Sequence, residues 1–291
     1  YNSKIKTNLV GQYNNNHLLS VIGLIPNNNW DKKLKKDYFI AFLLKSKITI
    51  NSTFIFFNFI FKKIRPNFLA VSGINLDTSG KIFSRFNPIK SFSHFYILNR
   101  LKKSKITKNL NNYKKKNYQK NYKELSLKIS RKLVSLPKSN YNPKKSKKFF
   151  TNKYIKNPYY KYFVMNFSEK NKLKFFFICR EIILKKYKTK IIRIIDFHGI
   201  IPKKFLISGS IQQYLKKNKI NYIDILCDGF YKNVLENIGF LKKNNKQIIP
   251  NHFEPYTGKD ARLNYCILLN KYKKNTILFK GDGDQDRPNI I

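Results

Sequence analysis

The chain has 291 residues, of which 42% are hydrophobic and 15% aromatic, and its formal net charge is +45. This apolar content is sufficient for a packed core, so the composition excludes a wholly disordered chain. The length accommodates one large domain or two of about 140 residues each. The longest apolar stretch, residues 53–61, is far shorter than the ~20 residues that a membrane-spanning helix needs, so no transmembrane segment is expected.

The net charge leaves two interpretations open. A strongly basic chain is typical of proteins with phosphate-rich partners such as nucleic acid. However, eight of the 60 basic residues are Arg, the residue whose planar fork suits phosphate and guanine edges. Lys, Asn, Ile, Phe and Tyr are all abundant, and AT-rich codons specify all of them, so composition bias is the alternative explanation. The charge alone therefore assigns no function.

The cysteines and the start of the chain indicate a reducing compartment. The three cysteines, Cys179, Cys227 and Cys266, are odd in number and far apart, so neither a disulfide framework nor a zinc site is expected. The sequence begins with Tyr1 rather than Met, and residues 1–12 contain no apolar run. This indicates a fragment or a processed chain without a signal peptide. A cytoplasmic location fits best.

Residues 1–100 predict a succession of helix, strand and helix. The expected elements are a helix at 51–64, a strand at 68–71 that opens into Ser72 and Gly73, a short helix at 79–86, and an aromatic strand at 94–99. In the last of these, His94, Tyr96 and Asn99 are expected to be core and capping residues.

Residues 101–150 differ in composition from both flanks. They hold seventeen Lys or Arg and one acid, Glu124. We interpret them as a basic linker with one short amphipathic helix around 122–136. A solvated, flexible connector is one interpretation of this segment. A surface that attracts nucleic acid or anionic lipid is the other.

Residues 151–291 predict strands first and then a unit that repeats the order of the first half. The strands are expected at 160–167, 173–183 and 191–197, followed by a helix at 207–217, a strand at 222–226 and a helix at 232–238 closed by Gly239. Helix, strand, glycine and short helix thus occur twice, about 150 residues apart, which is typical of a duplicated domain. We therefore predict an N-terminal domain at 1–100 and a C-terminal domain at 151–291.

The predicted fold class is α/β (α+β), with two mixed sheets that carry helices on both faces and are joined by the basic linker. Four strings in this pattern stand out: residues 194–199 (IIDFHG), 228–240, 253–256 (FEPY) and 280–289 (KGDGDQDRPN). Together with the element order, they resemble the GNAT acyltransferase superfamily, and more narrowly the tandem-GNAT proteins allied to FemAB-type aminoacyl transferases. The resemblance covers most of 160–289, and 20–100 in outline.

The resemblance implies a fold that splays two central strands apart and transfers an acyl group from a thioester or charged carrier. Acyl-coenzyme A is the implied donor, its pyrophosphate held by backbone N–H groups at a helix N-terminus on a glycine-rich loop. The chain departs from that pattern, because residues 43–52 contain no glycine and the second half offers Gly199 followed by Lys203 and Lys204. These three residues are the candidates for cofactor binding, and the first half matches the pattern less well.

Four polar residues are candidates for catalysis. Asp196 and His198 end a hydrophobic strand, where they would face the expected cleft as general base or acid. Alternatively, Asp196 caps the following turn and His198 is a partly buried polar residue. Asp228 ends the next strand, at the edge where open α/β sheets bind ligands, or else begins a turn with Gly229. Glu254 lies among aromatic residues, where burial would suit it to general-base work, unless a lysine pairs with it.

The acidic tail completes the set of candidates. Asp286 and Arg287, together with Tyr256, are candidates for lining the substrate cleft. The alternation of Asp and Gly over 282–287 resembles a calcium loop but lacks the Glu at its twelfth position, so no metal is expected. The alternative role of these acids is to order the C-terminus against lysines.

The sequence therefore predicts an acyltransferase-like protein. It would carry an N-acyl or aminoacyl group from a small-molecule donor to an amine of a sugar or surface-polymer precursor. Motifs of nucleotide-binding, serine-hydrolase and zinc-protease families are absent. Two alternatives stay open: a basic, ribosomal-type nucleic-acid-binding protein that uses the linker, and a catalytically inactive GNAT-like scaffold.

Overall fold

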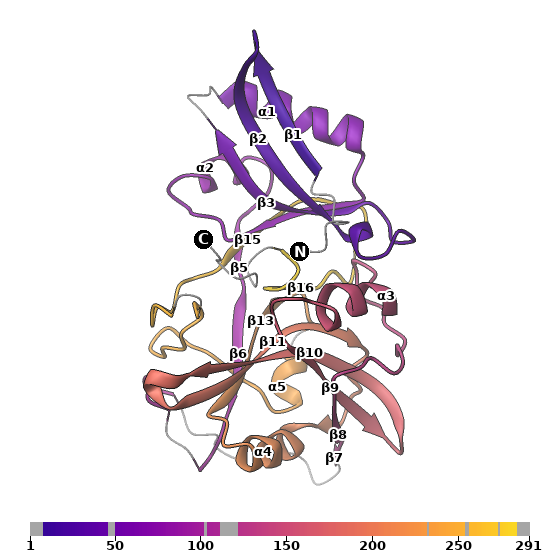
Figure 1. Ribbon diagram of the computed structural model, residues 1–291, viewed down its shortest axis with the longest axis vertical. Coiled ribbons are helices and arrows are strands. Elements are labelled where there is room, and N and C mark those ends of the chain that lie inside the picture. The colour runs from indigo at the N-terminus through magenta and orange to yellow at the C-terminus, as the bar shows by residue number, and fades with distance from the viewer. Residues whose placement is uncertain are drawn as a thin grey trace.

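The computed structural model describes residues 8–45, 50–101, 104–110, 122–231, 233–253, 256–272 and 274–283. Within them, the strands form a six-stranded and an eight-stranded mixed sheet and a small two-stranded ladder. Figure 1 shows the two large sheets as two lobes, with β1 and β2 in the upper lobe and β8 to β11 in the lower one. The predicted mixed α/β class is confirmed.

The six-stranded sheet forms the small lobe. Its order is β1 (Asn8–Asn14), β2 (His17–Pro26), β3 (Asp37–Lys45), β4 (Phe68–Ser72), β15 (Asn264–Asn270) and β5 (Lys90–Ser91). The central neighbours β3 and β4 are parallel, and the other pairs are antiparallel.

The eight-stranded sheet forms the large lobe. Its order is β14 (Leu241–Lys242), β6 (Ser93–Leu98), β13 (Tyr222–Asp228), β11 (Thr189–Gly199), β10 (Lys172–Leu184), β9 (Tyr162–Glu169) and β8 (Ser126–Ser130), with β16 (Leu278–Phe279) paired to the end of β13. Here too the central pair, β11 and β13, is parallel, and its neighbours are antiparallel. The two sheets therefore share one pairing pattern.

Each sheet takes a strand from the other half of the chain. Strand β15 lies between β4 and β5 in the small lobe, and β6 lies between β13 and β14 in the large lobe. A cut between residues 100 and 151 would thus separate both strands from their sheets. The division of the chain into the domains 1–100, 101–150 and 151–291 stays a prediction, and it does not coincide with the division into sheets.

Helices cover one face of the small lobe's sheet. Helix α1 (Ile50–Phe59) continues into a π-helical turn, η2 (Ile60–Ile64), and α2 (Gly80–Phe83) follows β4. Their buried residues, Phe57 and Phe83 among them, pack with strand residues such as Ile22 and Leu69. The predicted helix at 51–64 is confirmed, and the one at 79–86 is shorter than predicted.

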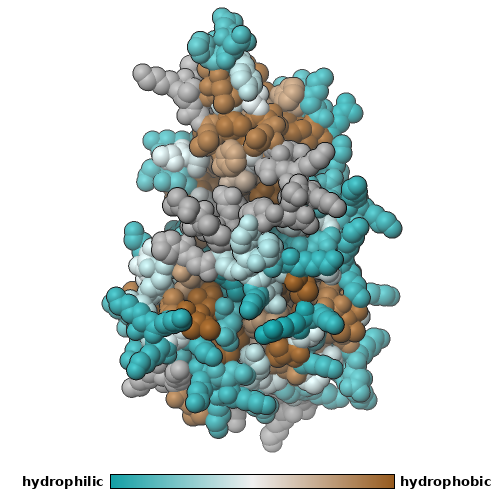
Figure 2. All heavy atoms as spheres, in the orientation of Figure 1, coloured by the Kyte–Doolittle hydropathy of each residue, from teal (hydrophilic) through white to brown (hydrophobic). Residues whose placement is uncertain are grey.

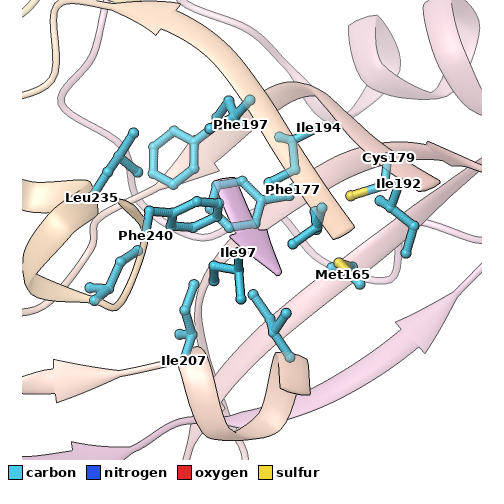
Figure 3. Close-up of a cluster of buried hydrophobic side chains, with 14 of the residues drawn as sticks. Ile97, Met165, Phe177, Cys179, Ile192, Ile194, Phe197, Ile207, Leu235 and Phe240 are labelled. Atoms are coloured by element: carbon cyan, nitrogen blue, oxygen red, sulfur yellow. The ribbon is translucent and has the colours of Figure 1, made fainter. Parts of the chain in front are cut away.

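Helices cover both faces of the large lobe's sheet. On one face, α4 (Ser208–Lys217) and α5 (Val234–Asn237) pack on β9, β10, β11 and β13, where side chains such as Phe177, Ile207 and Phe240 converge (Figure 3). On the other face lie α3 (Lys147–Phe150) and the π-helical turn η3 (Thr151–Ile155). Two short 3-10 turns, η1 (Asn27–Asn29) and η4 (Lys185–Tyr187), complete the elements.

The helix predicted around 122–136 is wrong. These residues form β7 (Lys123–Glu124) and β8, which pair with β12 (Phe205–Leu206) and β9. The reason is their period: Leu125 and the half-buried Leu127 and Ile129 alternate with exposed Ser126 and Lys128, as in a strand with one buried face. This part of the basic segment is thus built into the fold. Across the described ranges, no helix is long and apolar enough to cross a membrane.

Candidate functional site

The parallel strands at the centre of the large lobe separate after a short stretch of pairing. Residues 191–194 of β11 pair with 222–225 of β13, and the pairing stops there. Opposite Ile178 and Cys179 of β10, the extra residue Ile195 of β11 forms a β-bulge, which bends the strand locally. The expected splaying of two central strands is therefore present, and Asp196, His198 and Asp228 all lie on the parts that diverge.

The chain's own C-terminal segment occupies the space between the diverging strands. Phe279 pairs with Cys227 of β13, whose other edge is already paired with β6, so β16 lies on the side of β11. The Phe279 ring lies 6.3 Å from that of Phe197 and 5.9 Å from that of Phe230. Gly281 lies so close to β11 that a Cβ there would be 2.2 Å from Cγ2 of Ile195. The split is thus filled by protein.

A buried ion cluster fastens this segment. The Nζ of Lys145 lies 2.7 Å from Oδ1 of Asp196 and 2.5 Å from Oδ1 of Asp282. The Tyr154 hydroxyl donates to Oδ2 of Asp196 over 2.8 Å, and the Phe279 amide donates to Oδ2 of Asp282 over 2.8 Å. All three charged side chains are buried. The cluster therefore ties β11, the basic segment and the C-terminal segment together.

The charged groups in this cluster shift one another's pKa values. Burial by itself would lower the pKa of Lys145, but the two carboxylates raise it above its ordinary value. Burial raises the pKa of Asp282, and the Asp196 carboxylate adds to that effect while Lys145 opposes it. Burial also holds the pKa of Tyr154 well above its usual range. Lys145 therefore stays an ammonium and Tyr154 a neutral donor, which suits a fastening role better than a nucleophilic one.

The N-terminus of α4, the expected donor-phosphate site, is occupied by a carboxylate of the same chain. Oε1 of Glu124 accepts hydrogen bonds from the amide of Ser210 over 2.9 Å and from its hydroxyl over 3.2 Å. The backbone beside it is also used, because the Lys123 amide donates to the carbonyl of Lys204 over 3.1 Å. The single acid of the basic segment thus stands where an anion is favoured. An open groove of about 560 Å³ lies next to it, lined by Gln213, Lys217 and neighbouring residues.

The glycine and lysines expected to bind a cofactor have different positions. Gly199 is buried, with φ of 125°, and a Cβ would lie 2.5 Å from the carbonyl of Lys174, so close packing onto β10 explains this glycine. Lys203 and Lys204 are exposed beside β12. The backbone carbonyl of Lys204 accepts a hydrogen bond from the amide of Lys123, the residue before Glu124.

A second polar pair lies at the end of β13, where the two lobes meet. The Tyr265 hydroxyl of β15 donates a short hydrogen bond to Oδ2 of Asp228. Burial, and then this bond, raise the pKa of Tyr265 far above its ordinary value, so the phenol stays protonated. Tyr265 is buried beside Phe92, whereas Asp228 is half-buried. Asp228, one of the predicted catalytic residues, is thus accessible to solvent and accepts a hydrogen bond from a phenol that is held in place by burial.

His198 does not join Asp196 in a catalytic pair. Its Nε2 lies 3.0 Å from the carbonyl oxygen of Pro137, and its ring lies 5.8 Å from that of Phe176 and 5.4 Å from that of Phe150. Burial lowers the pKa of His198 from 6.5 to about 4. It is a partly buried polar residue, as the alternative interpretation has it.

The shifted pKa of His198 predicts a pH dependence of stability. Between pH 6.5 and about 4, the unfolded chain binds a proton that the native protein does not, so stability that is present above pH 6.5 is lost as the pH falls. One such site contributes about 3 kcal/mol over this window. His198→Gln, which retains a donor for Pro137, should therefore lose that much less stability on acidification, measured by urea unfolding at a series of pH values. Equal losses in both proteins would contradict the assignment.

The remaining predicted residues lie elsewhere. Tyr256 is half-buried and stacks on Phe253, with ring centroids 5.9 Å apart, and meets Tyr187 edge-on at 5.1 Å. This places it in the aromatic cluster around Ile249. Glu254, Asp286 and Arg287 lie outside the described residues, so their roles stay predictions. Within the described ranges, no cluster of His, Cys, Asp and Glu is arranged to hold a metal ion.

Sequence reasoning missed a buried charge network in the middle of the sheet. The Arg193 guanidinium donates to both carboxylate oxygens of Asp224, over 3.0 Å and 2.6 Å, and to the carbonyls of Pro250 and Asn251. His94 completes it, with Nε2 2.9 Å from Oδ2 of Asp224. The signal was in the sequence: the apolar runs 191–195 and 222–226 each have one charged residue at or near the middle, Arg193 and Asp224, and the two charges are opposite.

Comparisons with known proteins place the chain only loosely. No known protein family matches its sequence, and no curated protein does. Similar solved structures include a GCN5-related N-acetyltransferase from Anabaena variabilis, with a TM-score of 0.44 and 8% identity over 90% of this chain and 63% of that chain. An acetyltransferase of the GNAT family from Colwellia psychrerythraea has a TM-score of 0.33 and 11% identity over 90% and 85%.

A third similar structure is a conserved protein of Enterococcus faecalis, given as a probable N-acyltransferase, with a TM-score of 0.45 and 8% identity over 90% of this chain and 62% of that chain. The chain spans less than two thirds of the length of the Anabaena and Enterococcus proteins. At such low identities and TM-scores, these likenesses assign no activity or substrate to this chain.

Proposed function

We propose that this chain is an acyltransferase-like protein whose chemistry lies at the junction of the two lobes, at Asp228 and Tyr265. We propose further that the split between β11 and β13 is closed and serves as a structural joint. The observation that carries the proposal is the Asp228–Tyr265 pair, a half-buried carboxylate held by a buried phenol at the carboxyl end of β13. Ligands bind at this edge in open α/β sheets.

The closure of the split is supported by the free energy that opening would require. Withdrawing Ile277, Leu278 and Phe279 exposes three buried apolar side chains, and withdrawing Asp282 breaks its ion pair with Lys145. Together these changes cost roughly 7–14 kcal/mol. A donor with a Kd near 1 μM binds with about 8 kcal/mol. The free energy gained by binding such a donor would therefore be about equal to, or smaller than, the free energy needed to open the split. A ligand shifts a conformational equilibrium only by the difference between its affinities for the two states.

The chemistry proposed for Asp228 is general-base catalysis of acyl transfer. The amine nitrogen of an acceptor attacks the acyl carbonyl carbon, the new C–N bond replaces the bond to the leaving sulfur or oxygen, and the amine proton passes to the Asp228 carboxylate. Tyr265 orients that carboxylate through its hydrogen bond. The acyl or aminoacyl donor, acyl-coenzyme A among them, and an amine of a sugar or surface-polymer precursor as acceptor come from the family resemblance alone. Asp196 is proposed as a structural residue.

The proposal is tested by assaying product formation with acyl-coenzyme A and aminoacyl donors against a panel of amino sugars and amines. Removal of a general base lowers rates by about 10²–10⁴-fold, so Asp228→Asn should lower turnover by that much while the fold is retained. Glu236→Gln in α5, an acid of the same lobe, is the matched control and should keep full activity. Equal activity in Asp228→Asn and wild type would overturn the proposal.

The basic segment gives the test a second arm. A short RNA should not raise the melting temperature at moderate salt if the function is transfer. Stabilisation by RNA that disappears as salt rises, without any product from the transfer assay, would favour the nucleic-acid-binding alternative. A chain that gives no product and binds neither donor nor RNA would favour the inactive scaffold.

A further inference from the structure

Among the described side chains of helix α1, large apolar ones lie on both the buried and the exposed side, and the polar Asn58 is exposed with them. Phe56, Phe57 and Ile60 are buried in the core of the small lobe, which uses one face of the helix. On the other face, Ile55 is 66% exposed and Phe59 48% exposed. A surface helix of a water-soluble domain normally turns polar side chains outward, so the outer face of α1 needs a partner.

This exposed surface continues beyond the helix. Phe54 is 40% exposed and its ring lies 5.1 Å from that of Phe86, the residue that links α1 to the segment after α2. Leu76, in the turn before α2, is 50% exposed. Figure 2, seen from the side on which β1 and β2 lie in front of α1, shows hydrophobic atoms on both lobes among hydrophilic side chains. Single exposed apolar residues are ordinary, but a contiguous group marks an interaction surface.

Cations border this surface. Lys62 and Lys63 are exposed in η2, the π-helical turn that directly continues α1, three and four residues after Phe59. Lys81 and Arg85 are exposed in and after α2. Residues 1–100 contain three acids, Asp31, Asp37 and Asp77. Two of them are buried and Asp77 is exposed. The surroundings of the outer face are therefore strongly positive.

The charge decides between the candidate partners. A second copy of this chain carries the same +45 charge, which opposes self-association. A bilayer with acidic headgroups offers acyl chains to Ile55 and Phe59 and phosphates to the lysines, whose long stems reach outward from an apolar surface. We propose that the outer face of α1 binds the surface of an anionic lipid bilayer, with Phe54, Ile55 and Phe59 at the acyl-chain boundary and Lys62 and Lys63 at the phosphates.

The proposal is tested by co-sedimentation of the full chain with vesicles of phosphatidylcholine mixed with phosphatidylglycerol, and with vesicles of phosphatidylcholine alone. We expect binding to the mixed vesicles that weakens as salt rises, and little binding to the neutral ones. The Ile55→Ser and Phe59→Ser double variant should reduce partitioning by at least ~10-fold. Its matched control is Ile183→Ser with Tyr231→Ser, which alters two exposed apolar residues of the other lobe and should leave binding unchanged.

A second pair of variants tests the lysines. Each Lys near an anionic surface strengthens binding about fivefold, so Lys62→Gln with Lys63→Gln should weaken it roughly 25-fold. Lys185→Gln with Lys186→Gln removes two exposed charges from the large lobe and should have little effect. Far-UV circular dichroism and the melting temperature report whether each variant is folded.

Three results would overturn the proposal. The first is that the substitutions of Lys62 and Lys63 weaken vesicle binding no more than those of the control lysines do. The attraction to the vesicle would then come from the net charge of the whole chain. The second is equal binding to neutral and mixed vesicles. The third is a folded Ile55→Ser and Phe59→Ser variant that binds vesicles as well as the wild type does. If that variant loses binding to polyglutamate, the partner is an acidic protein. If it loses self-association, the partner is a second copy of the chain.

Discussion

Replacing Lys145 with Met is expected to lower the free energy of unfolding by about 3–5 kcal/mol. The substitution leaves Asp196 and Asp282 buried beside each other without the ammonium that both now contact. Uncompensated buried charge is among the few causes of so large an effect. The C-terminal segment then loses its ion pair and is held in the split by its apolar residues and by hydrogen bonds such as that from the Lys280 amide to the Leu226 carbonyl. The change is measured by urea denaturation, followed by fluorescence and circular dichroism.

The matched control is Lys144→Met. Lys144 is exposed, and its loss should change stability by no more than ~0.5 kcal/mol. Adding Asp282→Asn to Lys145→Met removes one of the two uncompensated carboxylates and should restore part of the loss. If Lys145→Met were as stable as Lys144→Met, the ion cluster would not fasten the segment.

Arg193→Met is expected to have a similarly large effect, about 3–5 kcal/mol. Burial alone would raise the pKa of Asp224, but Arg193 and then His94 hold it well below its ordinary range. Without Arg193, that carboxylate is buried with His94 as its remaining partner, and the carbonyls of Pro250 and Asn251 lose a donor. Urea unfolding measures the loss.

Arg193→Lys distinguishes geometry from charge. The planar guanidinium of Arg193 donates to two carboxylate oxygens and two carbonyls, which the ammonium of a lysine cannot do. We therefore expect Arg193→Lys to recover less than half of the stability that Arg193→Met loses. An Arg193→Lys protein as stable as the wild type would mean that the positive charge, and not the geometry of the guanidinium, stabilises the network. His94→Phe, which leaves the Arg193–Asp224 pair intact, should have the smaller effect.

Local elements were predictable from the sequence because their signals are local. The strand at 222–226 and the helix at 207–217 are confirmed as β13 and α4, since their apolar periods are strong. The exchange of β6 and β15 between the sheets was not predictable, because pairing partners far apart in the sequence leave no periodic trace in either strand. The prediction of a helix around 122–136 was wrong because the apolar residues there alternate over only about seven positions. Next to many lysines, so short an alternation resembles an amphipathic helix.

The candidate site was predictable in part. The positions of Asp196 and Asp228 on the diverging parts of two neighbouring strands followed from the strand pattern. Their partners did not: Lys145 is one of many lysines in a basic segment, and Tyr265 comes from a strand of the other lobe. The filling of the split by β16 was hidden for the same reason, since the string around Asp282 is polar and its buried partner Lys145 lies far away in the sequence.

The closure of the split is tested most directly by hydrogen exchange at the amides of Phe279 and Lys280. The first donates to Asp282 over 2.8 Å and the second to the carbonyl of Leu226 over 3.1 Å. We expect both amides to exchange only through global unfolding, at a rate that acyl-coenzyme A does not increase. Faster exchange at these two amides when acyl-coenzyme A is added, while β9 and β10 stay protected, would show that the split opens for a donor and would contradict its role as a structural joint.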